Sequence, residues 1–146
     1  MKRQKLRRYA FLILFGMSVS KDSPEEAMKN YLDSFKDDYL EEDGEFKGKD
    51  LEFVRNTVCG VYEHQKEIDE VINSYSKGYE ISRISRVALA ALRISMFEIM
   101  FCEDIPDSVS VNEAIETVKA YEDEKTKKFV NGILGAYLSE KNKWIL

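Results

Sequence analysis

Apolar residues recur along the chain at the spacing of α-helices, and no window alternates between apolar and polar positions as a half-buried strand would. The phase of the apolar stripe weakens near His64 and Gln65, so we predict a break between two helices there. The pattern predicts an all-α bundle of about seven helices. The clearest stripes, with intervals of three and four residues, cover residues 51–62, 68–75, 111–121 and 129–138.

The segment from Ser85 to Phe101 is the most apolar part of the chain. A helix with so little polar surface is typical of the centre of a bundle. Two charged residues, Arg93 and Glu98, are embedded in it, and an unpaired buried charge is costly. We expect each of them to tie this central helix to a neighbouring loop. The alternative is that they belong to a surface that binds a partner.

Several helix ends are marked by residues that satisfy the terminal backbone groups. Ser23 followed by Pro24 predicts a helix start, because serine can cap the end and proline suits the first helical position. Ser85 is a second candidate cap. Ser110 and Glu113 match the S-x-x-E capping box, which predicts that a helix begins at Ser110.

Two glycines, Gly132 and Gly135, lie inside the last apolar stripe. Glycine in a helix interior costs up to about 1 kcal/mol relative to alanine. We therefore expect a neighbouring backbone to approach this helix closely at both positions.

Length and punctuation favour one domain built from two halves. A chain of 146 residues has the size of a single domain, and two prolines with seven glycines are too few for an all-β sandwich or barrel. Gly78 ends the first half, so we expect helical subdomains over about residues 1–78 and 79–146. Residues 37–52 hold eight acids, two lysines and two glycines, which is typical of a solvated loop.

The net charge of −5 conceals a segregation of charge along the chain. Five cations stand among the first eight residues, and no acid precedes Asp22. Taking these five from the 22 basic residues leaves 17 against 27 acidic ones, so the rest of the chain carries −10. A basic arm on an acidic body is typical of a protein that binds a polyanion at one end. The basic arm, residues 1–8, contains Lys2, Arg3, Lys5, Arg7 and Arg8.

The basic arm and the apolar residues after it, 9–15, admit two further interpretations. They fit a secretory signal peptide, with small residues at 18–20 in the position of a cleavage site. They also fit an amphipathic helix in which Phe11, Leu12 and Phe15 lie off the buried stripe. The uncharged stretch of 12 residues is too short for a membrane span, which needs about 20.

Residues that could carry catalysis are few. The single histidine, His64, is better explained as a surface residue of a helix than as a ligand. Cys59 and Cys102 form no CxxC pair, and both fit small buried apolar residues of a reduced cytoplasmic protein. No Gly-rich phosphate loop, HExxH or GxSxG motif occurs. We therefore expect no enzyme activity, no metal and no cofactor.

Four segments match a known set of motifs in order and spacing. They are the arginine-rich start running into Ala10, Leu14 and Phe15, then Leu92–Ile99, then Ile105–Pro106 with Val111–Glu116, and finally Lys128–Leu134. Together they resemble the NusB family of bacterial transcription antitermination factors over nearly the whole chain. Ser95 and Phe97 stand where the family commonly has alanine and tyrosine. Residues 86–88 lack the acidic residue that the family carries shortly before its Leu-Arg pair, which puts one contact with a partner in doubt.

The resemblance implies an all-helical protein of two packed subdomains whose basic arm belongs to the mature cytoplasmic chain. It implies a factor that binds the boxA element of nascent RNA together with NusE, a small-subunit ribosomal protein. The complex would help RNA polymerase to read through terminators in ribosomal RNA operons. No membrane is implied, and since several relatives self-associate, a homodimer is left open.

The resemblance also suggests which residues bind RNA. The cations of the basic arm would hold phosphates and give affinity and salt dependence. Phe129 would either stack on a base or pack in the core, and Asn131 would either read a base edge or bond to a neighbouring helix. The expected RNA-binding residues are Lys2, Arg3, Lys5, Arg7, Arg8, Lys127, Lys128, Phe129 and Asn131.

For NusE, Phe15 is the first candidate because it lies off the predicted stripe and matches a family aromatic. Phe11, Leu12 and Glu98 complete the expected partner-binding set. Two other functions are left open by the residues. One is a helical protein-binding adaptor with an incidental basic arm, and the other is a stand-alone RNA-binding module of an rRNA-modifying system.

Overall fold

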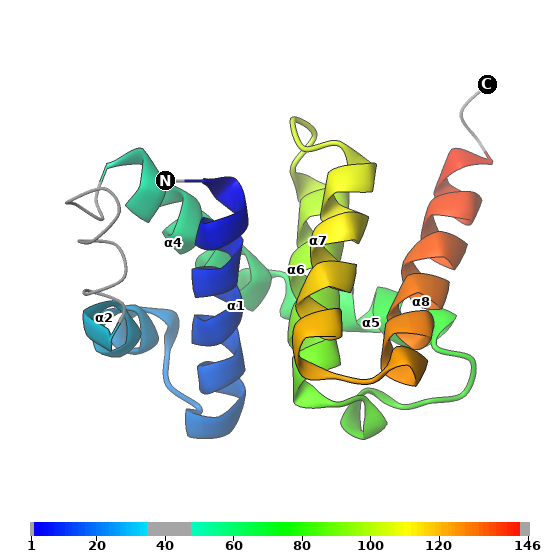
Figure 1. Cartoon of the computed structure of the whole chain (residues 1–146), viewed down its shortest axis with the longest axis horizontal. Coiled ribbons are helices and arrows are strands. Elements are labelled where there is room, and N and C mark those ends of the chain that lie inside the picture. The colour runs from blue at the N-terminus through cyan, green and yellow to red at the C-terminus, as the bar shows by residue number, and fades with distance from the viewer. Residues whose placement is uncertain (1, 35–47, 144–146) are drawn as a thin grey trace. The chain divides into compact units, whose positions relative to one another are not determined.

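The computed structural model describes residues 2–34 and 48–143. These ranges contain seven α-helices, one short 3₁₀-helix and no strand, which confirms the predicted all-α fold (Figure 1). The chain divides into two compact units, Met1–Glu63 and His64–Leu146. The division therefore coincides with the helix break predicted at His64, and the expected boundary near Gly78 lies inside the second unit. Most of the expected acidic loop, residues 37–47, lies outside the described residues. The loop predicted for residues 49–52 is wrong, because a helix begins at Lys49.

The first unit is built from three described helices. Helix α1 packs against both α2 and α4, and α2 packs against α4. Helix α1 lies against the side chain of Tyr31 on α2 at Gly16, where a Cβ atom would overlap the ring and hydroxyl of Tyr31. A larger residue at this position would displace that ring. The helices are α1 (Arg3–Ser20), α2 (Pro24–Ser34) and α4 (Lys49–Glu63).

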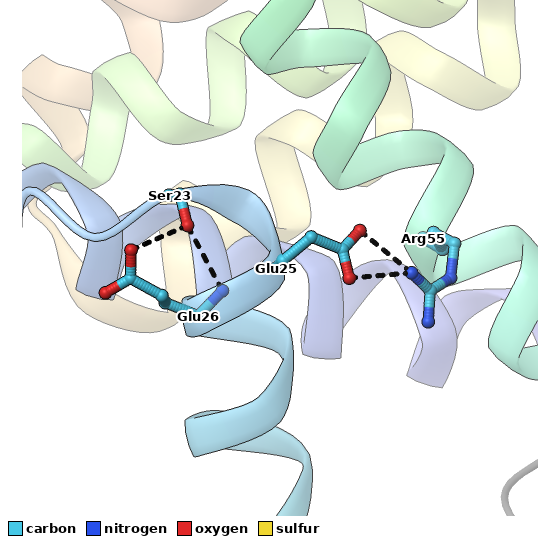
Figure 2. Close-up of polar contacts among 4 residues, drawn as sticks. All are labelled: Ser23, Glu25, Glu26 and Arg55. Atoms are coloured by element: carbon cyan, nitrogen blue, oxygen red, sulfur yellow. Dashed lines mark hydrogen bonds and ion pairs between the residues drawn. The ribbon is translucent and has the colours of Figure 1, made fainter.

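The start of α2 confirms the predicted cap (Figure 2). The Ser23 hydroxyl oxygen accepts a hydrogen bond from the Glu26 backbone N–H at 3.3 Å and donates to the Glu26 carboxylate at 2.9 Å. On the opposite side, Arg55 of α4 donates to both carboxylate oxygens of Glu25 at 3.0 and 3.2 Å. Both side chains of this ion pair are exposed, so its contribution is at most about 1 kcal/mol, and the apolar contacts carry the packing of this unit.

The second unit is organised around α6, as predicted from its apolar sequence. Helix α6 packs against α5, α7 and α8, and Leu92 and Met96 on it are fully buried. The Ser85 hydroxyl accepts a hydrogen bond from the Ala88 backbone N–H at 3.1 Å, which confirms the predicted cap. The elements are α5 (Gln65–Tyr75), η1 (Ile81–Arg83), α6 (Arg86–Phe101), α7 (Asp107–Tyr121) and α8 (Glu124–Asn142).

The two charges embedded in α6 both bind neighbouring helices. Arg93 donates from Nε and Nη2 to the two carboxylate oxygens of Asp69 on α5, each at 2.8 Å. Glu98 is 1% exposed, and its carboxylate accepts a hydrogen bond from the Ser110 hydroxyl of α7 at 2.8 Å. Both charges therefore tie down the central helix as expected, but their partners lie on helices and not on loops.

The predicted start of α7 at Ser110 is wrong. The helix begins at Asp107, directly after Pro106, whose extended backbone ends the preceding loop. Ser110 lies within the first turns of the helix and is 1% exposed. Its hydroxyl serves Glu98, and its carbonyl oxygen accepts a hydrogen bond from the Ser95 hydroxyl at 3.0 Å. A tertiary contact thus uses the side chain that the local motif assigned to a cap.

The expectation of a close backbone approach at Gly132 and Gly135 is also wrong. Both residues are exposed, and a Cβ atom built on either would meet no atom within 4 Å. The space beside these two glycines of α8 is open. They therefore lower the stability of the helix, and no close packing contact compensates for it.

Replacing Gly132 and Gly135 together by alanine should raise the free energy of unfolding by about 0.5–1 kcal/mol per site, because alanine favours the helix and meets no obstacle. Urea denaturation followed by circular dichroism measures this gain. Gly16→Ala is the matched control, and it should show no gain because its Cβ would collide with Tyr31. A loss of stability in the Gly132/Gly135 double variant would contradict the open geometry.

Candidate nucleic-acid interface

The basic arm is the beginning of α1 and not a separate extension. The helix starts at Arg3, and Lys2 precedes it in an extended conformation without a side-chain cap. No acidic residue stands in the first turn. Cations at this end are unfavourable, because the helix dipole already places partial positive charge there. The first backbone N–H groups of a helix have no partner within the helix, and together with the cations they suit a bound anion.

Phe53 of α4 holds two of the arm's cations. The Arg3 guanidinium carbon lies 4.2 Å from the centroid of the Phe53 ring, and that of Arg7 lies 5.6 Å from it. Arg7 is only 8% exposed. Both distances are in the range of cation–π attraction. Phe53 therefore anchors the arm on α4, a role that no sequence spacing could indicate, because the contact joins residues about fifty positions apart.

The remaining cations of the arm differ in their exposure. Lys2 and Arg8 are exposed, and so is Arg3 in spite of its contact with Phe53. Lys5 is half-buried, with its Nζ 6.0 Å from the centroid of the Tyr9 ring. Lys2, Arg3 and Arg8 thus offer the most surface to a phosphate, and the buried Arg7 offers the least.

A second cluster of expected RNA-binding residues lies near the start of α8 in the second unit. Asp123 caps this helix by accepting hydrogen bonds from the Thr126 backbone N–H at 2.9 Å and from the Thr126 hydroxyl at 2.8 Å. These bonds lower the pKa of the Asp123 carboxyl below its ordinary value, because they stabilise the ionised form. The D-x-x-T pattern is a capping signal that the sequence analysis did not use. Lys127 lies 3.6 Å from Glu124, whereas Lys128 is exposed.

Phe129 is partly packed and partly exposed, so its position fits both core packing and stacking on a base. It is half-buried, and its ring packs against the Tyr79 ring in an edge-to-face arrangement, with centroids 5.4 Å apart. Asn131 is exposed, and within the described ranges its side chain bonds to no neighbouring helix. The structure therefore gives no support to a purely structural role for Asn131.

The expected partner-binding residues separate into two pairs. Phe15 and Leu12 are half-buried and retain surface. Phe11 is 3% exposed, so the expectation that it lies off the buried stripe is wrong. Helix α1 buries residues around most of its circumference, and Phe11 stacks with Phe15 at a centroid distance of 6.2 Å. Glu98 is enclosed by its contact with Ser110 and presents no carboxylate surface to a partner.

The candidates for catalysis form no common site in the described residues, and the expectation that Cys59 and Cys102 are buried is wrong, because both are partly exposed. His64 lies at the break between α4 and α5 and not within a helix, with its Nδ1 2.7 Å from Glu67 and its ring stacked on Phe101. Burial, followed by the nearby Glu25 carboxylate, raises the pKa of the Cys59 thiol and keeps it protonated at neutral pH. In residues 2–34 and 48–143, no three His, Cys, Asp or Glu side chains gather into a group that could hold a metal ion.

None of the helices in the described part of the chain combines the length and the apolar content that crossing a bilayer requires.

Comparison with known proteins gives matches over almost the whole chain. The model of the NusB family matches residues 4–139. The transcription antitermination protein NusB of Acetivibrio thermocellus is 37% identical over 141 residues, which cover 97% of this chain and 91% of that protein. A structure of T. maritima NusB has a TM-score of 0.83 at 31% identity and covers 100% of this chain and 99% of its own. A structure of the antitermination factors NusB and NusE in complex with dsRNA has a TM-score of 0.78 at 28% identity. The match covers 94% of this chain and 96% of that chain.

Phe53→Leu should loosen the first two turns of α1, because leucine keeps the apolar contact but removes the ring beneath Arg3 and Arg7. Loss of roughly 1 kcal/mol of cation–π attraction corresponds to about fivefold faster exchange of the hydrogen-bonded amides of residues 5–7. Hydrogen exchange followed by mass spectrometry measures this change in exchange rate. Unchanged exchange in α6 serves as the control for an intact fold. Equal exchange of residues 5–7 in both proteins would remove Phe53 from the anchoring of the arm.

Proposed function

This chain belongs to the NusB family, and from that membership we propose that it is a transcription antitermination factor that binds boxA RNA together with NusE. It would act by binding and not by catalysis, within the complex in which RNA polymerase reads through terminators of ribosomal RNA operons in the cytoplasm. The observation that carries the proposal is the basic first turn of α1, which is held over Phe53, contains no acidic residue of its own, and leaves Lys2, Arg3 and Arg8 exposed. A solved relative with NusE and dsRNA supports the same assignment.

The arm supplies affinity in this proposal. Lys2, Arg3 and Arg8 are exposed and would contact phosphates, while Arg7 keeps the helix start on α4. A phosphate at the helix start would offset the repulsion between the cations and the helix dipole. Because phosphate contacts carry no sequence information, the choice of boxA falls to other residues.

In this proposal the residues near the start of α8 recognise the boxA sequence. Asn131 is exposed and carries both a donor and an acceptor, as reading a base edge requires. Phe129 presents part of its ring for stacking on an unpaired base. Lys127 and Lys128 flank Phe129 in the sequence and would hold the adjacent phosphates.

Fluorescence anisotropy with a boxA RNA and a scrambled RNA of equal length, at near-physiological salt, tests the function. We expect binding to favour boxA and to tighten when NusE is added, because both partners contact the RNA. Equal, weak binding to both RNAs would mean that the arm is only a general polyanion patch, and binding to NusE without retention of RNA would favour a protein adaptor. Preference for boxA with indifference to NusE would favour a module of an rRNA-modifying system.

Lys2→Gln combined with Arg8→Gln should weaken RNA binding and flatten its dependence on salt. Each lost phosphate contact on single-stranded RNA reduces the slope of log K against log salt by about 0.7, so the pair should reduce it by about 1.4. Lys29→Gln with Lys66→Gln is the matched control, since it makes the same charge change at exposed lysines of α2 and α5. An equal change of slope in the two double variants would show a general effect of net charge.

Phe15→Asp should weaken NusE binding by at least about 2 kcal/mol, or about 30-fold, as for an aromatic anchor at an interface. Isothermal titration calorimetry measures the affinity, and Val19→Asp, one turn further along α1 at an exposed position, is the control. Sedimentation of the unaltered protein, of Phe15→Asp and of Leu12→Asp shows whether a homodimer forms and whether it depends on these two residues. Wild-type affinity of the Phe15→Asp variant would place the NusE surface elsewhere.

A further inference from the structure

Tyr79 carries an exposed aromatic ring that the function proposed above does not use. It lies between α5 and η1, is 50% exposed, and meets Phe129 edge to face with ring centroids 5.4 Å apart and planes at 72°. The two rings form an aromatic corner, defined here as Tyr79 with Phe129. Aromatic pairs of this geometry are stable, yet they leave ring surface uncovered. An uncovered ring beside a residue expected to stack on RNA suggests a larger stacking site.

A tight turn fixes Tyr79 before any ligand binds. The Tyr79 backbone N–H donates to the Ser76 carbonyl oxygen at 3.2 Å, and the buried Ser76 hydroxyl donates to the Tyr79 carbonyl oxygen. Between them, Lys77 and Gly78 both have left-handed backbone conformations, with φ of 51° and 91°. Such a conformation is sterically unfavourable for lysine, so the turn is held by its hydrogen bonds. The backbone from which the ring projects is therefore set before binding, which lowers the entropic cost of placing the ring.

The charges beside the aromatic corner favour a nucleotide over an apolar peptide. Lys77 lies two positions before Tyr79 and Lys128 directly precedes Phe129 in the sequence, and both lysines are exposed. Glu80 is the single acid adjacent in sequence to either ring. Rings flanked by cations suit a planar base attached to a phosphate backbone, which is how proteins hold unpaired nucleotides.

We propose that Tyr79 is a base-stacking residue, and that the aromatic corner receives one unpaired base of single-stranded RNA. The proposal rests on the proposed function, since it names a further contact in the same RNA site. The two rings that would stack on the base come from two elements of the second unit. The turn after α5 carries Tyr79, and α8 carries Phe129. The turn holds one ring and the helix holds the other, so their spacing is set by the packing of this unit.

Tyr79→Leu and Tyr79→Phe test the proposal with a single-stranded boxA RNA as the probe. Stacking on one base predicts about tenfold weaker binding for Tyr79→Leu, and affinity within about twofold of wild type for Tyr79→Phe, which keeps the ring. The slope against salt should not change in either variant, because no charge is removed. Tyr62→Leu is the matched control, with 52% exposure and an acidic neighbour, Glu63. Circular dichroism of each variant establishes that it is folded.

Three results separate the outcomes. Wild-type affinity of Tyr79→Leu, with normal boxA binding by the unaltered protein, would overturn the stacking role and leave the proposed function intact. Equal weakening of the leucine and phenylalanine variants would overturn it too, because the hydroxyl and not the ring would then be responsible. Absence of boxA preference in the unaltered protein would instead refute the proposed function. A 2-aminopurine base in the probe adds a direct readout, since quenching that Tyr79→Leu abolishes and Tyr79→Phe keeps reports stacking on this ring.

Discussion

The constraint on which the second unit depends is the need to satisfy two charges carried by its most apolar helix, one buried and one partly buried. Glu98 is buried on α6, where an unpaired charge would cost several kcal/mol, and the partly buried Arg93 lies on the same helix. Asp69 on α5 and Ser110 on α7 meet that need with hydrogen bonds of 2.8 Å. Apolar packing alone tolerates sliding between helices, whereas these bonds are directional. They therefore specify how α5 and α7 lie on α6, and α8 completes the unit against the same helix.

The first unit departs from local stability rules at the start of α1. A helix that begins with lysine and arginine and lacks an acid in its first turn opposes its own dipole. The fold compensates with the Phe53 ring, which attracts Arg3 and Arg7 and leaves neighbouring cations in solvent. Departures of this kind are expected where function requires them. In the function proposed here, the unfavourable charge is relieved when RNA phosphates bind.

Two errors of the sequence analysis share one cause. Ser110 matched a capping box and Gly132 and Gly135 matched a close helix contact, and both interpretations used information from only a few neighbouring residues. In the folded chain the Ser110 hydroxyl bonds to a residue twelve positions away, and the glycines face open space. The close glycine contact occurs instead at Gly16, opposite Tyr31. Local patterns specify what a residue can do, and tertiary packing selects among those options.

The sequence by itself determined the helical class, the break at His64, the caps at Ser23 and Ser85, the central position of α6 and the basic arm. These features depend on periodicity, capping and charge, which are encoded within a few residues of one another. Only the tertiary structure decided that Arg93 meets Asp69, that Arg3 and Arg7 lie over Phe53, and that Phe129 meets Tyr79. Each of these contacts joins residues more than twenty positions apart. No local period encodes such a pairing, because it follows from the way whole helices pack against one another.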